Sequence, residues 1–252
     1  MRYIFSLFIL FFAGQYLHSQ AIQDIFEAKT IISSAGDTLN YRVLLPENYD
    51  SKKQYPLVLF LHGAGERGSD NNAQLFHGSK MFTNPVNREK YPAIVLFPQC
   101  PTNGYWFYED RFGENRKAEL SMVKELLDTY LALSTVDKER IYIMGLSMGG
   151  FGTFDLVCRF PDVFAAAIPI CGGIDPDRLK VTVGKVKFRI YHGDNDEVVP
   201  VENSRNAYRA LKSYGADVGY FEFPGCKHDS WVPAFNQPDF FSWLFEQKKN
   251  EL

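Results

Sequence analysis

The sequence predicts one α/β domain in which helices cover both faces of a doubly wound, mostly parallel sheet. Apolar runs alternate with longer amphipathic stretches along most of the chain, which is typical of α/β folds. Several apolar runs are nearly continuous, as in 55–63, and strands of this kind are buried on both faces. No break in composition and no long insertion interrupts the alternation, so we expect no separate cap domain.

The predicted strands combine β-branched, aliphatic and aromatic residues in short runs, most of which end at glycine or proline. In chain order they are 39–46, 55–63, 92–99, 140–145, 164–173, 187–193 and 218–225.

Amphipathic helices are predicted between the strands and after the last one. Apolar residues recur at three- and four-residue spacing over 114–134, 201–215 and 233–247. Gly215 closes the second of these stretches in the position of a helix C-terminal cap.

The composition argues for a folded chain that does not bind nucleic acid. Of the 252 residues, 46% are hydrophobic and 22 are phenylalanine, which is enough for a large core. The formal net charge is −3 and Lys and Arg form no dense run, so the basic surface that nucleic acid requires is not predicted.

The N-terminus has the pattern of a secretory signal peptide. Arg2 precedes the apolar run 3–13, and the residues that follow are polar and small. The run is too short for a comfortable membrane span, although an uncleaved anchor is the alternative. We expect residues 1–19 to be removed and 20–252 to be exported to the periplasm or outside the cell, without stable insertion in a membrane.

The cysteines do not decide between two interpretations. Cys100, Cys158, Cys171 and Cys226 are even in number, so an oxidising compartment would permit disulfides. Their spacing favours no pairing, and small buried apolar residues would look the same. They form no pattern typical of a zinc site.

A serine stands where a predicted strand meets a predicted helix. The sequence Gly-Leu-Ser-Met-Gly occupies 145–149, directly after the strand 140–145. This context is that of a nucleophile elbow, in which the serine has a strained backbone and its neighbours two residues away pack too closely for side chains. Ser147 is therefore a candidate nucleophile.

Its partners follow in the order acid, then histidine. Asp194, Asp196 and Glu197 come after the strand 187–193, and His228 comes after the last strand. The order Ser, acid, His differs from that of two other common serine-hydrolase triads. His62 and His192 also end strands, but we expect them to brace loops, and we expect His77 to be solvated.

The motifs at these strand ends together resemble those of the α/β-hydrolase superfamily. They are Gly-Leu-Ser-Met-Gly at 145–149, His-Gly at 192–193 followed by Asp196 and Val-Val-Pro at 198–200, and His228. The stretch LHGAGERGSDN at 61–71 further resembles a branch of secreted esterases described as predicted peptidases or phospholipase/carboxylesterase-like proteins.

The resemblance implies an α/β-hydrolase catalytic domain over 20–252 and assigns a role to each candidate. Ser147 is implied as nucleophile, His228 as base and Asp196 as acid, with Asp194 as the main alternative. Asp175 and Asp177 lie at another acid position known in this fold.

The same resemblance implies an oxyanion hole beside the serine. Its donors are the backbone N–H groups of Met148 and Ala64, and Gly65 is the competitor of Ala64.

Two loops without regular pattern, 65–91 and 100–113, follow strand ends and are expected to border an open cleft. Trp106, within the second loop, and Trp231, close behind His228, are the predicted walls of the substrate pocket.

The resulting hypothesis is a secreted serine esterase that acts on carboxyl esters, with acetyl or feruloyl groups on plant polysaccharide as the expected substrates, similar to carbohydrate esterases. A serine peptidase of the prolyl-oligopeptidase-like type is the alternative, and a non-catalytic binding protein on the same fold is a lesser one. No metal and no organic cofactor is implied.

Overall fold

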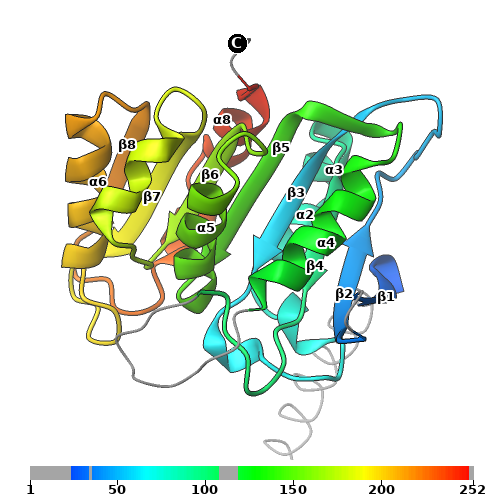
Figure 1. The fold of residues 1–252 in the computed structure, drawn as a ribbon, viewed down its shortest axis with the longest axis horizontal. Helices are drawn as coiled ribbons and strands as arrows, with labels where there is room; N and C mark the ends of the chain where they lie inside the picture. The colour runs from blue at the N-terminus through cyan, green and yellow to red at the C-terminus, as the bar shows by residue number, and fades with distance from the viewer. Residues whose placement is uncertain (1–23, 34–35, 108–118, 250–252) are drawn as a thin grey trace, which may run out of the picture.

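The computed structural model describes residues 24–33, 36–107 and 119–249, which form one sheet with helices on both of its faces (Figure 1). The sheet has eight strands in the order β1-β2-β4-β3-β5-β6-β7-β8. In chain order the strands are β1 (Glu27–Ile32), β2 (Thr38–Leu44), β3 (Tyr55–Leu61), β4 (Ile94–Pro98), β5 (Val136–Leu146), β6 (Ala166–Ile170), β7 (Lys187–Gly193) and β8 (Val218–Phe223).

The strands from β3 to β8 all run parallel, and only β2 pairs antiparallel, with β1 on one side and β4 on the other. The prediction of a doubly wound, mostly parallel sheet is therefore confirmed. The edge strand β1 was not predicted from the sequence because none of its side chains is fully buried, so its apolar residues do not alternate clearly.

Three longer helices cover one face of the sheet and shorter ones cover the other (Figure 1). The first face carries α4 (Leu120–Leu131), α5 (Met148–Arg159) and α6 (Glu202–Ser213). The second face carries α2 (Ser79–Thr83), α3 (Pro85–Lys90), α7 (Trp231–Phe235) and α8 (Phe240–Glu246). None of the helices within the described ranges is long and apolar enough to cross a membrane.

The core is divided into two layers by the sheet, and β3 contributes to both. Leu57, Leu59 and Leu61 pack into the layer under α4 and α5. Val58 and Phe60 point the other way and pack with Phe82 and Phe240. Every residue of β3 is buried, which is why its sequence is apolar throughout instead of alternating.

Two segments differ from the predicted pattern. The stretch 233–247 forms two helices instead of one, because Pro238 disfavours helical backbone at the residue before it. The predicted loop 65–91 contains α2, α3 and the 3₁₀ helices η1 (Ala64–Glu66) and η2 (Ala73–Leu75), all too short to show a helical period. Residues 108–113 of the second predicted loop lie outside the described ranges, so the cleft remains a prediction.

The turn between β5 and α5 is closely packed against the end of β3. A Cβ on Gly145 would lie 2.4 Å from the Gly149 carbonyl oxygen, and a Cβ on Gly149 would lie 1.9 Å from the Leu61 carbonyl oxygen. Between them Ser147 has φ +53° and ψ −118°, in the left-handed range that side chains rarely adopt. The glycines therefore remove the steric obstacle to this turn.

His62 fastens the loop after β3 to the end of β4. Its Nδ1 donates to the Gly63 carbonyl over 2.6 Å, and its Nε2 accepts from the Cys100 backbone N–H over 2.9 Å. A neutral imidazole satisfies both contacts, because one nitrogen donates and the other accepts. Burial lowers the pKa of His62 to about 4, which keeps the ring neutral. His62 thus braces a loop, as the sequence predicts.

A groove of about 950 Å³ lies at the other end of the sheet. It is bordered by Tyr55, Arg88, Tyr91 and Phe245, and its strand residues Tyr55, Pro56 and Arg140 lie in the first halves of β3 and β5. The serine and histidine candidates follow strand ends, so this groove is not part of their site.

Gly149→Ala is expected to lower the free energy of unfolding by more than about 3 kcal/mol, because its methyl group would overlap the Leu61 carbonyl. Gly65→Ala is the matched control, since no atom lies within 4 Å of the added Cβ. Urea unfolding of both variants measures the difference. Equal stability of the two would contradict the packing described for the turn.

Acid should destabilise the protein partly through His62. The unfolded chain protonates this residue near its ordinary pKa of 6.5, whereas the folded chain does so only near 4. The stability that neutral His62 contributes is complete above pH 6.5 and is lost as the pH falls toward 4, by about 3 kcal/mol.

His62→Gln is the test of this pH dependence, because the amide can make both hydrogen bonds but does not titrate. The free energy of unfolding of the wild type should fall by about 3 kcal/mol more than that of the variant between pH 6.5 and 4. Parallel pH profiles of the two proteins would show that His62 is not held neutral.

Candidate active site

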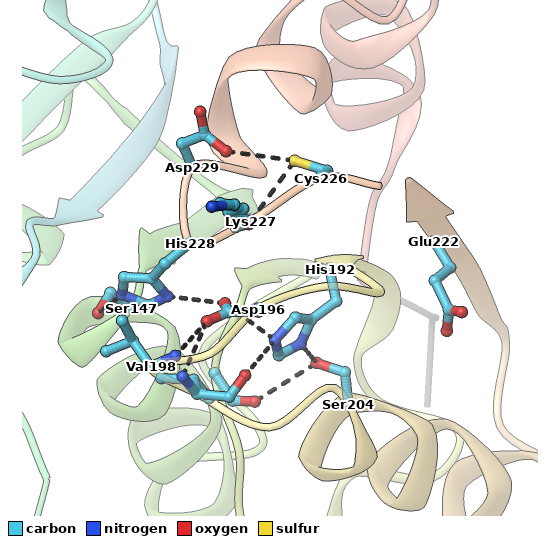
Figure 2. Close-up of polar contacts among 12 residues, drawn as sticks. Ser147, His192, Asp196, Val198, Ser204, Glu222, Cys226, Lys227, His228 and Asp229 are labelled. Carbon is cyan, nitrogen blue, oxygen red and sulfur yellow. Dashed lines mark hydrogen bonds and ion pairs between the residues drawn. The ribbon is translucent and has the colours of Figure 1, made fainter. Parts of the chain in front are cut away.

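Ser147, His228 and Asp196 meet at the ends of β5, β8 and β7 and form a continuous chain of hydrogen bonds (Figure 2). The Ser147 Oγ lies 2.8 Å from His228 Nε2, and His228 Nδ1 lies 2.7 Å from Asp196 Oδ2. With Nδ1–H donating to the carboxylate, Nε2 is free to accept the serine proton. The structure thus brings Ser147, His228 and Asp196 into contact in the predicted order.

The backbone holds Ser147 at the tip of the turn. Its N–H donates to the Ile170 carbonyl over 2.9 Å, and its own carbonyl accepts from the Phe151 N–H over 3.1 Å. The first bond ties the turn to β6 and the second begins α5. The hydroxyl is consequently directed toward His228.

Both oxygens of the Asp196 carboxylate have partners. Oδ1 accepts from the backbone N–H groups of Val198 and Val199, each over 2.9 Å, while Oδ2 faces His228. Burial alone would raise the pKa of Asp196, but the hydrogen bonds from His228 and the two backbone groups hold it below its ordinary value. The carboxylate therefore stays charged and fixed in orientation.

The other acids considered from the sequence lie elsewhere. Asp194 Oδ1 accepts from the Gly225 N–H over 2.6 Å and so joins the loop after β7 to the turn after β8. Asp175 caps the N-terminus of η4 (Pro176–Thr182) by accepting from the Asp177 N–H. Asp177 in turn accepts from the Tyr214 hydroxyl. None of these contacts involves His228.

A second histidine supports the loop that carries Asp196. His192 is fully buried, with Nε2 3.0 Å from the Val199 carbonyl and Nδ1 2.7 Å from the Ser204 hydroxyl (Figure 2). Burial lowers its pKa, so the ring is neutral and Nε2–H donates to the carbonyl. This matches the loop-bracing role predicted for His192.

The predicted oxyanion donors come from two segments, the start of α5 and the loop after β3. Met148 is the first residue of α5, and its N–H is one of the groups that a helix leaves without an internal partner. Ala64 begins η1 in the loop after β3. That loop is close to the serine, since a Cβ on Gly63 would lie 3.7 Å from Ser147 Cβ.

The prediction that Trp106 forms a pocket wall is wrong. Its side chain is fully enclosed, and its indole N–H donates to the His62 carbonyl over 3.1 Å. The room for it is provided by α5, where a Cβ on Gly152 would lie 2.5 Å from Trp106 Cβ. Trp106 therefore anchors the loop after β4 in the core and offers no surface to a ligand.

Trp231 does lie beside the site. Two residues near it, His77 and Glu66, were not predicted as site residues. Its ring meets that of His228 edge to face, with centroids 5.7 Å apart, and lies 5.1 Å from the ring of His77. His77 Nε2 is 3.8 Å from Glu66 Oε1. The expectation of a solvated His77 is thus wrong, because its ring packs between aromatic neighbours.

The four cysteines are free in the structure, which favours the interpretation as small buried or half-buried residues. Cys171 Sγ lies within 4.8 Å of donor atoms of Asp196 and His228, a grouping that could hold a metal ion. However, burial raises the pKa of Cys171 to about 12, and the other two groups already bind each other. We assign no metal to this cluster.

A family model described as Phospholipase/Carboxylesterase matches residues 48–239. Among curated proteins, poly(3-hydroxyalkanoate) depolymerase C of Paucimonas lemoignei is 31% identical over 47% of this chain and 28% of its own length. Probable feruloyl esterase C of Aspergillus terreus is 26% identical over 71% of this chain and 64% of its own. The chain thus spans less than two thirds of either relative.

Among solved structures, a thermostable esterase superposes with a TM-score of 0.84 and 38% identity, over 90% of this chain and 64% of that one. A ferulic acid esterase at 21% identity and a TM-score of 0.67 shares the fold. The match to the family model covers most of the chain and includes the turn at Ser147 and the loops of Asp196 and His228. The chain belongs to the phospholipase/carboxylesterase family of the α/β-hydrolase superfamily, a family of hydrolases.

Proposed function

We propose that the protein is a serine carboxylesterase in which Ser147, His228 and Asp196 form the catalytic triad. The observation that carries this proposal is the unbroken hydrogen-bond chain from Ser147 Oγ through the His228 ring to Asp196. Family membership supports the reaction class, and the strained backbone of Ser147 supports its role as nucleophile.

In the first half of the reaction Ser147 Oγ attacks the ester carbonyl while His228 Nε2 takes the hydroxyl proton. The bond to the alcohol oxygen then breaks, and His228 returns the proton to that oxygen, leaving an acyl-serine. Water repeats the sequence to release the acid. Asp196 holds the ring in the required tautomer and stabilises its positive charge.

The negative charge that develops on the carbonyl oxygen requires donors already in position. We assign these to the N–H groups of Met148 and Ala64, with the positive end of the α5 dipole acting in the same direction. Each donor in such a hole lowers the barrier by about 3 kcal/mol.

For the substrate we propose acetyl or feruloyl esters of plant polysaccharide. The similarity to a probable feruloyl esterase supports an acyl group of this class. The partner of the enzyme would then be an ester that is free in solution or attached to a polymer. Trp231 next to His228 supports a site that packs a ring of the substrate against an aromatic side chain.

Ser147→Ala should lower kcat for p-nitrophenyl acetate by at least about 10⁴-fold, because no other hydroxyl replaces the nucleophile. Hydrolysis of this ester and of methyl ferulate, together with labelling by a fluorophosphonate, provides the measurement. Wild-type protein that hydrolyses neither ester and takes no label would refute the proposed activity.

Asp196→Asn should lower kcat by about 10⁴-fold, because the amide favours the wrong tautomer of His228. Asp194→Asn is the matched control on the same loop, since its carboxylate contacts only the Gly225 N–H among the contacts described. The assignment of the acid would be reversed if the Asp194 variant were the inactive one.

We also propose that the protein is exported and that residues 1–19 are removed. These residues lie outside the described ranges, and the support is the apolar run 3–13 after Arg2. Mass spectrometry of protein recovered from the producing cells should find an N-terminus near Gln20. Intact protein that begins at Met1 would contradict export by cleavage.

A further inference from the structure

Glu66 lies at the edge of the site, although the mechanism gives it no role. Its Oε2 lies 3.1 Å from the position that a Cβ on Gly63 would occupy, and Ser147 Cβ lies 3.7 Å from the same position. The side chain is only 13% exposed. Burial raises its pKa, while hydrogen bonds from the backbone N–H groups of Gly63 and Glu66 oppose the rise. A carboxylate is therefore held close to the nucleophile.

Glu66 is not directed toward its charged neighbour. The Nε of Arg67 donates to the Ala64 carbonyl over 3.0 Å, and its guanidinium carbon lies 5.0 Å from the centre of the Tyr105 ring. The Glu66 carboxylate faces His77 instead, with 3.8 Å between Oε1 and Nε2.

His77 connects Glu66 to the catalytic histidine through aromatic contacts. Its ring centre lies 4.7 Å from that of Phe76 and 5.1 Å from that of Trp231, which in turn packs edge to face on His228. His228 must reach the alcohol oxygen in order to protonate it. The residues packed against His228 therefore border the alcohol half of an ester, on the side away from the acyl group.

One hydroxyl group can bond to both Glu66 and His77. Their separation of 3.8 Å is too long for a direct hydrogen bond, but a hydroxyl to one side of the pair, about 2.8 Å from each atom, can accept from Nε2–H and donate to the carboxylate. Burial lowers the pKa of His77, so a neutral ring is available to donate. The flanking ring of Trp231 can cover the face of a bound ring.

We propose that Glu66, His77 and Trp231 form a subsite for a neutral sugar on the alcohol side of the ester. The inference rests on the proposed esterase function and specifies its substrate class: the leaving group is a pyranose or furanose with a free hydroxyl next to the esterified one. The Glu66 carboxylate disfavours an anionic sugar through repulsion. Phe76, 75% exposed, extends the aromatic surface toward a second sugar unit.

The test compares two acetyl esters that differ only in the alcohol, p-nitrophenyl acetate and an acetylated xylotriose. Glu66→Gln removes the charge, and His77→Phe keeps an aromatic ring beside Phe76 and Trp231 but removes the nitrogen donor. The exposed Glu89→Gln, near the other end of the sheet, is the control. We expect kcat/KM for the sugar ester, relative to that for p-nitrophenyl acetate, to fall at least about tenfold in both site variants and to stay constant in the control.

A second measurement does not depend on turnover. Binding of xylotriose to Ser147→Ala protein, followed by NMR or calorimetry, should weaken by a similar factor when Glu66→Gln or His77→Phe is added. The wild-type protein could hydrolyse neither ester while xylotriose still binds and the added Glu66→Gln or His77→Phe still weakens that binding. In that case the esterase function fails and the sugar subsite stands.

Two results would overturn the subsite. The site variants could leave the ratio of the two rates unchanged, and an equal fall for both esters would assign Glu66 to the positioning of the loop after β3. Alternatively, Ser147→Ala protein could bind xylotriose no more tightly with Glu66 and His77 present than without them.

Discussion

The turn after β5 can form only because nothing larger than hydrogen stands between Gly149 and the Leu61 carbonyl. This contact brings the start of α5 against the end of β3 and thereby brings the nucleophile next to the loop that begins at His62. The left-handed backbone of Ser147 is stabilised by bonds to β6 and α5, so the strain at one residue is offset by its neighbours. Every other part of the site is arranged around this fixed point.

Two buried, neutral histidines give the surrounding loops comparable rigidity. His62 connects the loop after β3 to β4, and His192 connects the loop after β7 to the start of α6. Neither loop has regular structure long enough to hold itself in place. The imidazole suits this task because one ring can donate at one nitrogen and accept at the other. The same residue type thus serves as support at two positions, and as proposed base at a third.

The sequence was most informative where chemistry and backbone geometry restrict the choice of residue. A serine between two glycines at a strand-to-helix turn, followed by an acid and a histidine after later strands, has few explanations, and the structure brings Ser147, Asp196 and His228 into contact. The alternation of elements likewise predicted the sheet, apart from the exposed edge strand β1. The helix break at Pro238 was missed, although proline restricts the residue before it.

Side-chain environments that depend on distant segments could not be predicted in this way. Whether Trp106 is a pocket wall or a core anchor is decided by the space above Gly152, nearly fifty residues later in the chain. His77 is packed by Trp231, and its distance from Glu66 depends on the path of the chain from η1 to the residues after η2. No periodicity in the sequence carries information about such contacts, because they follow from tertiary packing alone.

The three residues of the proposed triad follow the ends of separate strands, with Ser147 and His228 81 positions apart. The segment that carries His228 follows Ser147 in the chain, and it comes directly after β8, which pairs with β7 in parallel. Parallel pairing requires long-range contacts and forms late in folding. A growing chain therefore carries Ser147 before it carries His228, and the hydrogen bond between them can form only after β8 has been synthesised and has joined the sheet.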